Sequence, residues 1–303
     1  MKLIKQSFEI LEQKDFTLKG IKQFIERCAR VSYKSEDRMT DTSYEKFVGM
    51  LESRDHARAL EFGTVHLQMY ISDFHKLRDT LCINNMWNDQ WIKYHYAGNL
   101  AYVTTNYRYY LAIIKVFPSV ESDFDPQDDE LYPKRYTVHM ILDRGVMDEF
   151  RTHVGLSHLA ESTRYCNYSK DKFNNEVTFI IPSWMNFPEI SIDLGNYDKT
   201  SVRSKDGNVH VIDTKPPYVE GDFIRSLCEA ESNYLSIVRN GWTPQQAREV
   251  LPLAVKSELI SCGFEDAWEN FFYRRCAKDA HPMAQEIAKP MHKEFIERGF
   301  IDK

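Results

Sequence analysis

Ser162 and Arg164 stand two positions apart in the run STRY, residues 162–165, and their side chains suit the binding of phosphate. A guanidinium presents a planar fork of N–H donors, and a hydroxyl adds a donor that can rotate toward the same oxygen atoms. Arg248 and Arg275 lie far downstream, and the three arginines could converge on one dianion. Because a single arginine on a helix is more often a surface or ion-pair residue, the prediction of a phosphate site depends on that convergence.

The composition describes a chain with enough apolar material for a large core. It has 303 residues, of which 43% are hydrophobic and 28% are charged, so one large domain or two small ones would fit. The net charge is −6 and there is no long basic run, which argues against a general nucleic-acid binder. A cluster of arginines can still attract a small anion, because the local field matters more than the net charge.

Neither a membrane segment nor a metal site is expected. No apolar run reaches membrane-spanning length, and the opening residues MKLIKQSFEILEQKDF are too polar for a secretory leader. The six cysteines are scattered, without a CxxC pair or a Cys–His spacing typical of metal sites. Scattered thiols in a chain without a leader indicate a reducing compartment, so we expect a cytoplasmic protein.

Hydrophobic periodicity predicts both helices and strands. Apolar residues three or four positions apart predict helices, and alternating ones predict strands. The predicted helices cover residues 18–33, 42–54, 145–156, 222–240 and much of 264–298. The predicted strands cover residues 61–72, 136–143 and 177–182.

Residues 187–221 are rich in Pro, Asp and Lys, and they have no clear period apart from a possible hairpin at DGNVHVID. We interpret this segment as a surface insertion. No internal repeat and no linker divides the rest of the chain. The elements therefore predict the α+β class and a single domain over residues 1–303, with strands early and helices late.

A set of short motifs carries a resemblance to a known enzyme family. In chain order they are ARVSY (29–33), RDHARALEFG with His56 and Glu61, NYR (106–108), DRG (143–145), STRY (162–165), AREVLP (247–252), and NFFYRR (270–275) followed by AHPMAQEI (280–287). One motif would be weak evidence, but the set covers most of the chain at workable spacings. The sequence resembles the flavin-dependent thymidylate synthases.

The resemblance implies a fold, an assembly and a reaction. The fold is the family's α+β catalytic domain, a mixed sheet flanked by helices, and the assembly is a homotetramer with active sites at subunit junctions. The reaction is the reductive methylation of dUMP at C5, with methylene-tetrahydrofolate as cosubstrate, FAD as cofactor and NADPH as reductant. Since the family needs no cysteine nucleophile, we expect Cys166 to be a small buried side chain.

The resemblance also assigns roles to residues, position by position. Ser162 and Arg164 match the positions that hold the dUMP phosphate and face its pyrimidine, and His56 matches a histidine beside the flavin ring; these three are the implied catalytic residues. The implied dUMP contacts are Glu149, Ser162, Arg164, Arg248 and Arg275. The implied FAD contacts are Ser32, His56, Arg58, His153, Ser157 and Asn270.

One motif departs from the family pattern. The family has an Arg-His-Arg triplet that helps to bind FAD, where this chain has Thr152, His153 and Val154. Losing two hydrogen bonds to charged groups would cost about 3–6 kcal/mol. Arg151 is displaced by one position, which on a helix over 145–156 would turn its side chain by roughly a hundred degrees, so we expect compensation from Arg58, Lys256 or a partner subunit instead.

The altered triplet leaves three functions open. The first is thymidylate synthesis with FAD. The second is a diverged enzyme that keeps dUMP and methylene-tetrahydrofolate but lets water capture the transferred carbon, which gives 5-hydroxymethyl-dUMP without a reductant. The third is a nucleotide-binding relative without catalysis.

Overall fold

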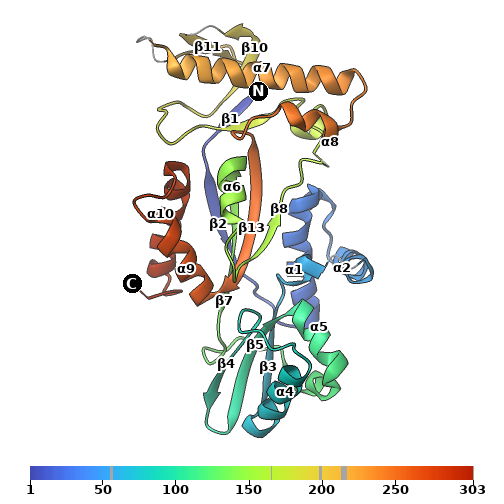
Figure 1. Cartoon of the computed structure of the whole chain (residues 1–303). Coiled ribbons are helices and arrows are strands. Elements are labelled where there is room, and N and C mark those ends of the chain that lie inside the picture. Colours follow the sequence, from blue (N-terminus) through green and yellow to red (C-terminus); the bar gives the residue numbers. More distant parts are fainter. Residues whose placement is uncertain (55–56, 165, 198–199, 213–216, 303) are drawn as a thin grey trace.

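The computed structural model of the chain describes residues 1–54, 57–164, 166–197, 200–212 and 217–302. In these residues the strands form three sheets, which lie one after another along the molecule with helices packed beside them (Figure 1). The predicted α+β class is confirmed, and one of the sheets mixes parallel and antiparallel strands. No helix in the described part of the chain is long and apolar enough to cross a membrane.

The middle sheet is antiparallel, and helices cover both of its faces. Its strands follow the order β2 (Ser7–Leu11), β7 (Arg135–Asp143), β13 (Lys256–Phe264) and β8 (Ser157–Ala160). One face packs against α6 (Arg144–Phe150), α9 (Glu265–Arg275) and α10 (Pro282–Glu297). The other face packs against α1 (Leu18–Tyr33). Because side chains alternate along a strand, Leu259 of β13 faces the first core and Ile260 faces the second.

The second sheet holds the early part of the chain. Its strands follow the order β4 (Ile92–Ala97), β5 (Leu100–Asn106), β3 (Thr64–Tyr70) and β6 (Phe124–Asp125). The helices nearby are α2 (Ser43–Ser53), α3 (Ala57–Leu60), α4 (Ile71–Ile83) and α5 (Tyr107–Val116), with 3₁₀ turns at Glu36–Arg38 and Pro118–Asp123. These elements share one hydrophobic core, to which α1 contributes Ile21 and Ile25.

The third sheet is mixed and includes much of the predicted insertion. Its strands follow the order β12 (Val209–Val211), β11 (Ser201–Ser204), β10 (Ile190–Tyr197), β1 (Lys2–Ile4) and β9 (Thr178–Ile180). Helix α7 (Val219–Arg239) packs on it, and α8 (Pro244–Ala247) follows. Two 3₁₀ turns, η3 (Asp171–Phe173) and η4 (Arg248–Val250), complete the fold. The single catalytic domain over 1–303 with an insertion around 187–221 stays a prediction.

Several predicted elements are confirmed with small shifts in their bounds. Helix α1 covers the predicted range 18–33, and Ile21, Phe24, Ile25 and Cys28 are buried. Strands β3 and β7 lie where alternation placed them, and β9 lies within the predicted strand 177–182. The sequence analysis missed the β4–β5 hairpin and strand β13, which is central in the middle sheet, and it found only the β11–β12 hairpin within 187–221.

Helix α6 is shorter than predicted, and this matters for the cavity described below. Asp143 caps its start, where the Asp143 Oδ1 atom accepts from the Val146 N–H at 2.7 Å. The helix ends at Phe150, because the Glu149 carbonyl accepts from the Thr152 hydroxyl at 2.7 Å and from Arg275 at 2.8 Å. Gly155, with φ +95°, then allows the chain to turn into β8. The prediction of a helix over 145–156 was therefore wrong beyond Phe150.

Candidate active site

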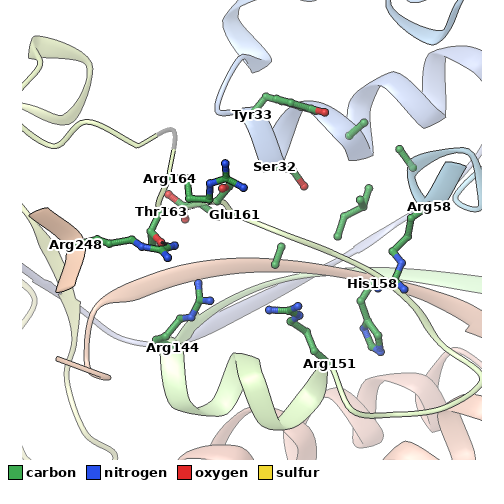
Figure 2. Close-up of a pocket in the computed structure, with 15 residues that line it drawn as sticks. Ser32, Tyr33, Arg58, Arg144, Arg151, His158, Glu161, Thr163, Arg164 and Arg248 are labelled. Atoms are coloured by element: carbon green, nitrogen blue, oxygen red, sulfur yellow. Dashed lines mark hydrogen bonds between the residues drawn. The ribbon is translucent and has the colours of Figure 1, made fainter. Parts of the chain in front are cut away.

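A cavity of about 550 Å³ opens between the end of α1, the segment after β8 and helix α6. Figure 2 shows the side chains around it. Five arginines line it, and they come from α3, α6, the residue after α6, the segment after β8 and η4: Arg58, Arg144, Arg151, Arg164 and Arg248. Among the described residues, Glu161 is the single carboxylate in the lining. The cavity is therefore suited to an anionic ligand.

The proposed phosphate residues meet at one end of this cavity. Ser162, Arg164 and Arg248 all line it, although Arg248 is far from the others in sequence. Arg248 Nη1 donates to Thr163 Oγ1 at 3.2 Å, and Arg164 Nε donates to Gln245 Oε1 at 3.4 Å. These contacts hold η4 and α8 against the segment after β8, so two of the three arginines converge.

Arg275 does not join them within the chain. It lies on the far side of α6, where its Nη1 atom is 2.8 Å from the Glu149 carboxylate and its Nε donates to His153 Nε2 at 2.7 Å. Burial, and after it the Arg275 charge, lower the pKa of His153 to about 4, so the ring is neutral and can accept this bond. The expected convergence of three arginines around one cavity is thus incomplete within this chain, and the Glu149 carboxylate is paired with Arg275.

The proposed flavin residues are divided among different places. Ser32 and Arg58 line the cavity, and the Ser32 hydroxyl is buried without a hydrogen-bond partner among the described residues. Ser157 lies outside it and donates to the Glu61 carboxylate at 2.5 Å. Asn270 lines a separate cavity of about 300 Å³ next to Val154. His56 and Tyr165 lie outside the described residues.

The altered triplet, Thr152 to Val154, does not face the large cavity with the two side chains that replace the family's arginines. Val154 is 70% exposed and faces the smaller cavity, and Thr152 is engaged with the Glu149 carbonyl. Arg151, however, lines the large cavity. Arg151 directly follows the last residue of α6 and keeps helical backbone angles, with φ −62° and ψ −13°, so its side chain continues the phase of the helix. That Arg151 does not replace a triplet arginine stays a prediction.

A buried ionic network lies beneath the cavity. Lys256 contacts Glu161 at 2.8 Å and also Glu258, and Glu258 in turn contacts Lys34 and His139. Burial alone would raise the pKa of Glu258, but the hydrogen bond with His139 and the charges of Lys256 and Lys34 hold it well below its usual range. The network connects α1 and β13 to the segment that carries Ser162 and Arg164.

Sequence reasoning missed several of these residues. Arg144 follows Asp143 directly and precedes Arg151 by seven positions, which is two helical turns and hence one face, so this spacing could have identified the pair. Lys256 was considered only as a compensating charge, and Glu161 and Glu258 were not considered. Cys166 is buried as expected, and burial raises its thiol pKa. In the described part of the chain, no three His, Cys, Asp or Glu side chains are grouped to hold a metal ion.

Comparisons with known proteins identify a family and two similar solved structures. The family described as thymidylate synthase complementing protein matches residues 134–298. No curated protein matches the sequence. Two solved structures of the UMP/dUMP methylase PolB from Streptomyces cacaoi are similar to this chain. The one bound with 5-Br dUMP is 14% identical, covers 99% of this chain and 93% of its own, and has a TM-score of 0.42.

The PolB structure bound with 5-Br UMP is 13% identical, covers 99% of this chain and 92% of its own, and also has a TM-score of 0.42. This structural likeness is too low to bear on the function of the chain. The family match covers more than half of the 303 residues, and it spans the segment after β8, Arg248 and Arg275.

Replacing Lys256 tests the buried network. Lys256→Met leaves Glu161 and Glu258 without their shared cation, so we expect the free energy of unfolding to fall by about 3–5 kcal/mol in urea titrations. Lys293→Met is the control, because Lys293 is an exposed lysine whose contact with Glu297 is 3.5 Å, and its loss should cost under about 1 kcal/mol. Equal losses in both variants would contradict the structural role of the network.

His158 should make stability depend on pH. Burial lowers its pKa from 6.5 to about 4, and its ring contacts Ser261 Oγ at 2.8 Å. Since the unfolded state binds the proton more readily, the free energy of unfolding should fall as the pH drops from about 6.5 to about 4. His158→Asn should make that fall shallower, whereas His95→Asn, at an exposed position, should not. Unfolding curves across this pH range decide the matter, and identical slopes in all three proteins would refute the assignment.

Proposed function

This chain belongs to the thymidylate synthase complementing protein family, and from that premise we propose that it is a flavin-dependent thymidylate synthase. In this proposal dUMP is methylated reductively at C5, with methylene-tetrahydrofolate as the carbon donor and NADPH as the reductant. The observation that carries the proposal is the meeting of Ser162, Arg164 and Arg248 in one cationic cavity.

The first task of these residues is to hold the nucleotide phosphate. Arg164 and Arg248 supply guanidinium donors, and Ser162 supplies a hydroxyl. All three residues line the cavity, as does Thr163, which accepts a hydrogen bond from Arg248. Charge-assisted hydrogen bonds of this kind fix orientation as well as affinity. Holding the phosphate at one end would place the pyrimidine deeper in the cavity, toward Ser32 and β8.

The second task is to make the pyrimidine reactive. C5 of uracil is a weak nucleophile, and fixed donors near the ring oxygens stabilise the negative charge that develops there. Arg164 is a candidate donor, because its guanidinium has five N–H groups and can bind more than the phosphate, and it lines the cavity. A cysteine nucleophile is not part of the proposal, and the buried Cys166 thiol donates to Glu161 at 3.2 Å.

Part of the predicted flavin set fits a flavin with a phosphate tail. Ser32 and Arg58 line the cavity and would hold FAD there, the first through its hydroxyl, which has no hydrogen-bond partner among the described residues, and the second through its charge. Bound FAD would supply the hydride that completes the methyl group, and NADPH would restore the reduced cofactor. His153, Ser157 and Asn270 have other contacts within the chain or face elsewhere.

A homotetramer is part of the proposal. Glu149 and Arg275 are predicted dUMP contacts, yet they lie on the far side of α6 from the cavity of their own chain. A site at a subunit junction would let them serve a neighbouring subunit's cavity.

The triplet favours one alternative, the formation of 5-hydroxymethyl-dUMP. The exposed Val154 and the backbone-bonded Thr152 supply no cation where the family has two. Weaker flavin binding would favour a redox-neutral route, in which water adds to the transferred carbon and tetrahydrofolate leaves.

Mass spectrometry of the nucleotide product distinguishes these reactions. The protein is incubated with dUMP, methylene-tetrahydrofolate and NADPH, with and without FAD. Thymidylate that forms only with FAD supports the proposal. A hydroxymethyl product that forms without NADPH supports the alternative and rejects the first reaction, and dUMP binding without any product would indicate a binding-only relative.

Arg164→Ala tests the phosphate assignment. The variant loses at least one charge-assisted hydrogen bond, so we expect dUMP affinity, measured by calorimetry, to fall on the order of 10- to 100-fold. Arg239→Ala, at an exposed position on α7, is the control and should leave the affinity unchanged. Unaltered dUMP binding in Arg164→Ala would show that the phosphate lies elsewhere.

A further inference from the structure

Two arginines of helix α6 line the cavity without a role in the proposed reaction. Arg144 is the first residue of α6, and Arg151 follows its last residue. The seven-residue spacing places both on one side of the helix, and their guanidinium groups lie along the side of the cavity that α6 forms (Figure 2). Neither matches a position of the Arg-His-Arg triplet, which here reads Thr152, His153 and Val154.

Among the described residues, a single carboxylate contacts these two guanidinium groups. Asp148 contacts Arg144 Nε and Arg151 Nη1, each at 3.3 Å. Both distances exceed the roughly 2.7–2.9 Å of a strong charge-assisted bond, and Asp148 is itself half-exposed. The contacts orient the two arginines through weak bonds, and one carboxylate neutralises only one of the two charges.

Among the described residues, Arg144 and Arg151 share Asp148, so one positive charge of this pair is left over. Glu161 does not neutralise it, because Glu161 is already paired with Lys256. A monophosphate ester carries about −1.5 to −2 at neutral pH. The charge left on the arginine pair favours an anionic group beside it.

We propose that Arg144 and Arg151 form a second phosphate-binding subsite, next to the one at Ser162, Arg164 and Arg248. The proposal rests on the proposed function for the first subsite. The two subsites are neighbours, because Arg144 and Arg248 also line a small adjoining cavity of about 180 Å³ together with Thr163. A phosphate there would add charge-assisted bonds that the altered triplet does not provide.

Two ligands would bring this second phosphate. One is a pyrimidine nucleoside diphosphate, whose second phosphate would reach past Arg248 to Arg144. The other is a dinucleotide such as FAD, whose pyrophosphate would lie along α6 while the flavin remained near Ser32 and Arg58. The chemistry of the subsite is the same in both cases, and binding measurements separate them.

The experiment compares the full-length protein with the double variant Arg144→Gln/Arg151→Gln. Calorimetry and thermal unfolding measure the binding of inorganic pyrophosphate, dUMP, dUDP and FAD. We expect the double variant to bind pyrophosphate on the order of 10- to 100-fold more weakly, and to show a smaller rise in Tm on its addition. Its affinity for dUMP should change by less than about threefold, because dUMP occupies the first subsite.

Comparing the affinities for dUDP, dUMP and FAD identifies which ligand brings the second phosphate. Tighter binding of dUDP than of dUMP, lost in the double variant, assigns the subsite to a nucleoside diphosphate. A loss of FAD affinity, with dUDP and dUMP bound equally, assigns it to the dinucleotide. Unchanged affinities for pyrophosphate, dUDP and FAD in the variant would overturn the proposal.

Control variants separate this result from failure of the first subsite or of folding. Arg164→Ala should lower the affinity for dUMP, whereas the double glutamine variant should not. If the unaltered protein did not bind dUMP at all, that result would count against the proposed function alone. Arg239→Gln controls for the change of net charge. Should the glutamine variant not fold, Arg144→Lys/Arg151→Lys keeps both charges but loses the planar forks, and it should still weaken pyrophosphate binding.

Discussion

The cavity depends on a chain of buried charges that runs beneath it from α1 to the segment after β8. Lys34 follows α1, Glu258 and Lys256 lie on β13, and Glu161 directly precedes Ser162. The Glu161 N–H also donates to the Glu258 carbonyl at 2.7 Å, which continues the β8–β13 pairing to the edge of the site. Ion pairs in such a place are costly to desolvate, so their value lies in position: each charge has its partner only when the three elements have the right register.

The charges of this network are paired, whereas in the described part of the chain the lining of the cavity above it has an excess of positive charge. The carboxylates beneath it are paired with lysines, whereas among the described residues Arg144 and Arg151 share one carboxylate, Asp148. Like charges held together destabilise a free protein and strengthen its binding of an anion, because the ligand relieves the repulsion. The cavity is therefore suited to an anion, and the fold keeps the positive charges near each other through Asp148 and Thr163.

The end of α6 links the cavity to the opposite side of the molecule. Arg275 donates to the Glu149 carbonyl and pairs with the Glu149 carboxylate, and these bonds help to end the helix before Arg151. Two predicted dUMP contacts, Glu149 and Arg275, thus form a helix-ending contact within the single chain. Arg275 also touches His153, so the residues that surround the altered triplet are connected to one another on the side away from the cavity.

Hydrophobic patterns and short motifs in order were enough to predict the α+β class, the extent of α1, the strands β3, β7 and β9, and the family. It placed Ser162, Arg164 and Arg248 in one site through resemblance. It missed β13, whose two faces are both buried, so that its residues lack the alternation of polar and apolar side chains that marks a half-exposed strand. The contact between Arg275 and the Glu149 carbonyl is visible only in the folded chain, because the donor and the acceptor lie 126 positions apart and local periodicity carries no information about so distant a donor. The cavity that Arg151 lines is likewise formed by segments that are far apart in the sequence.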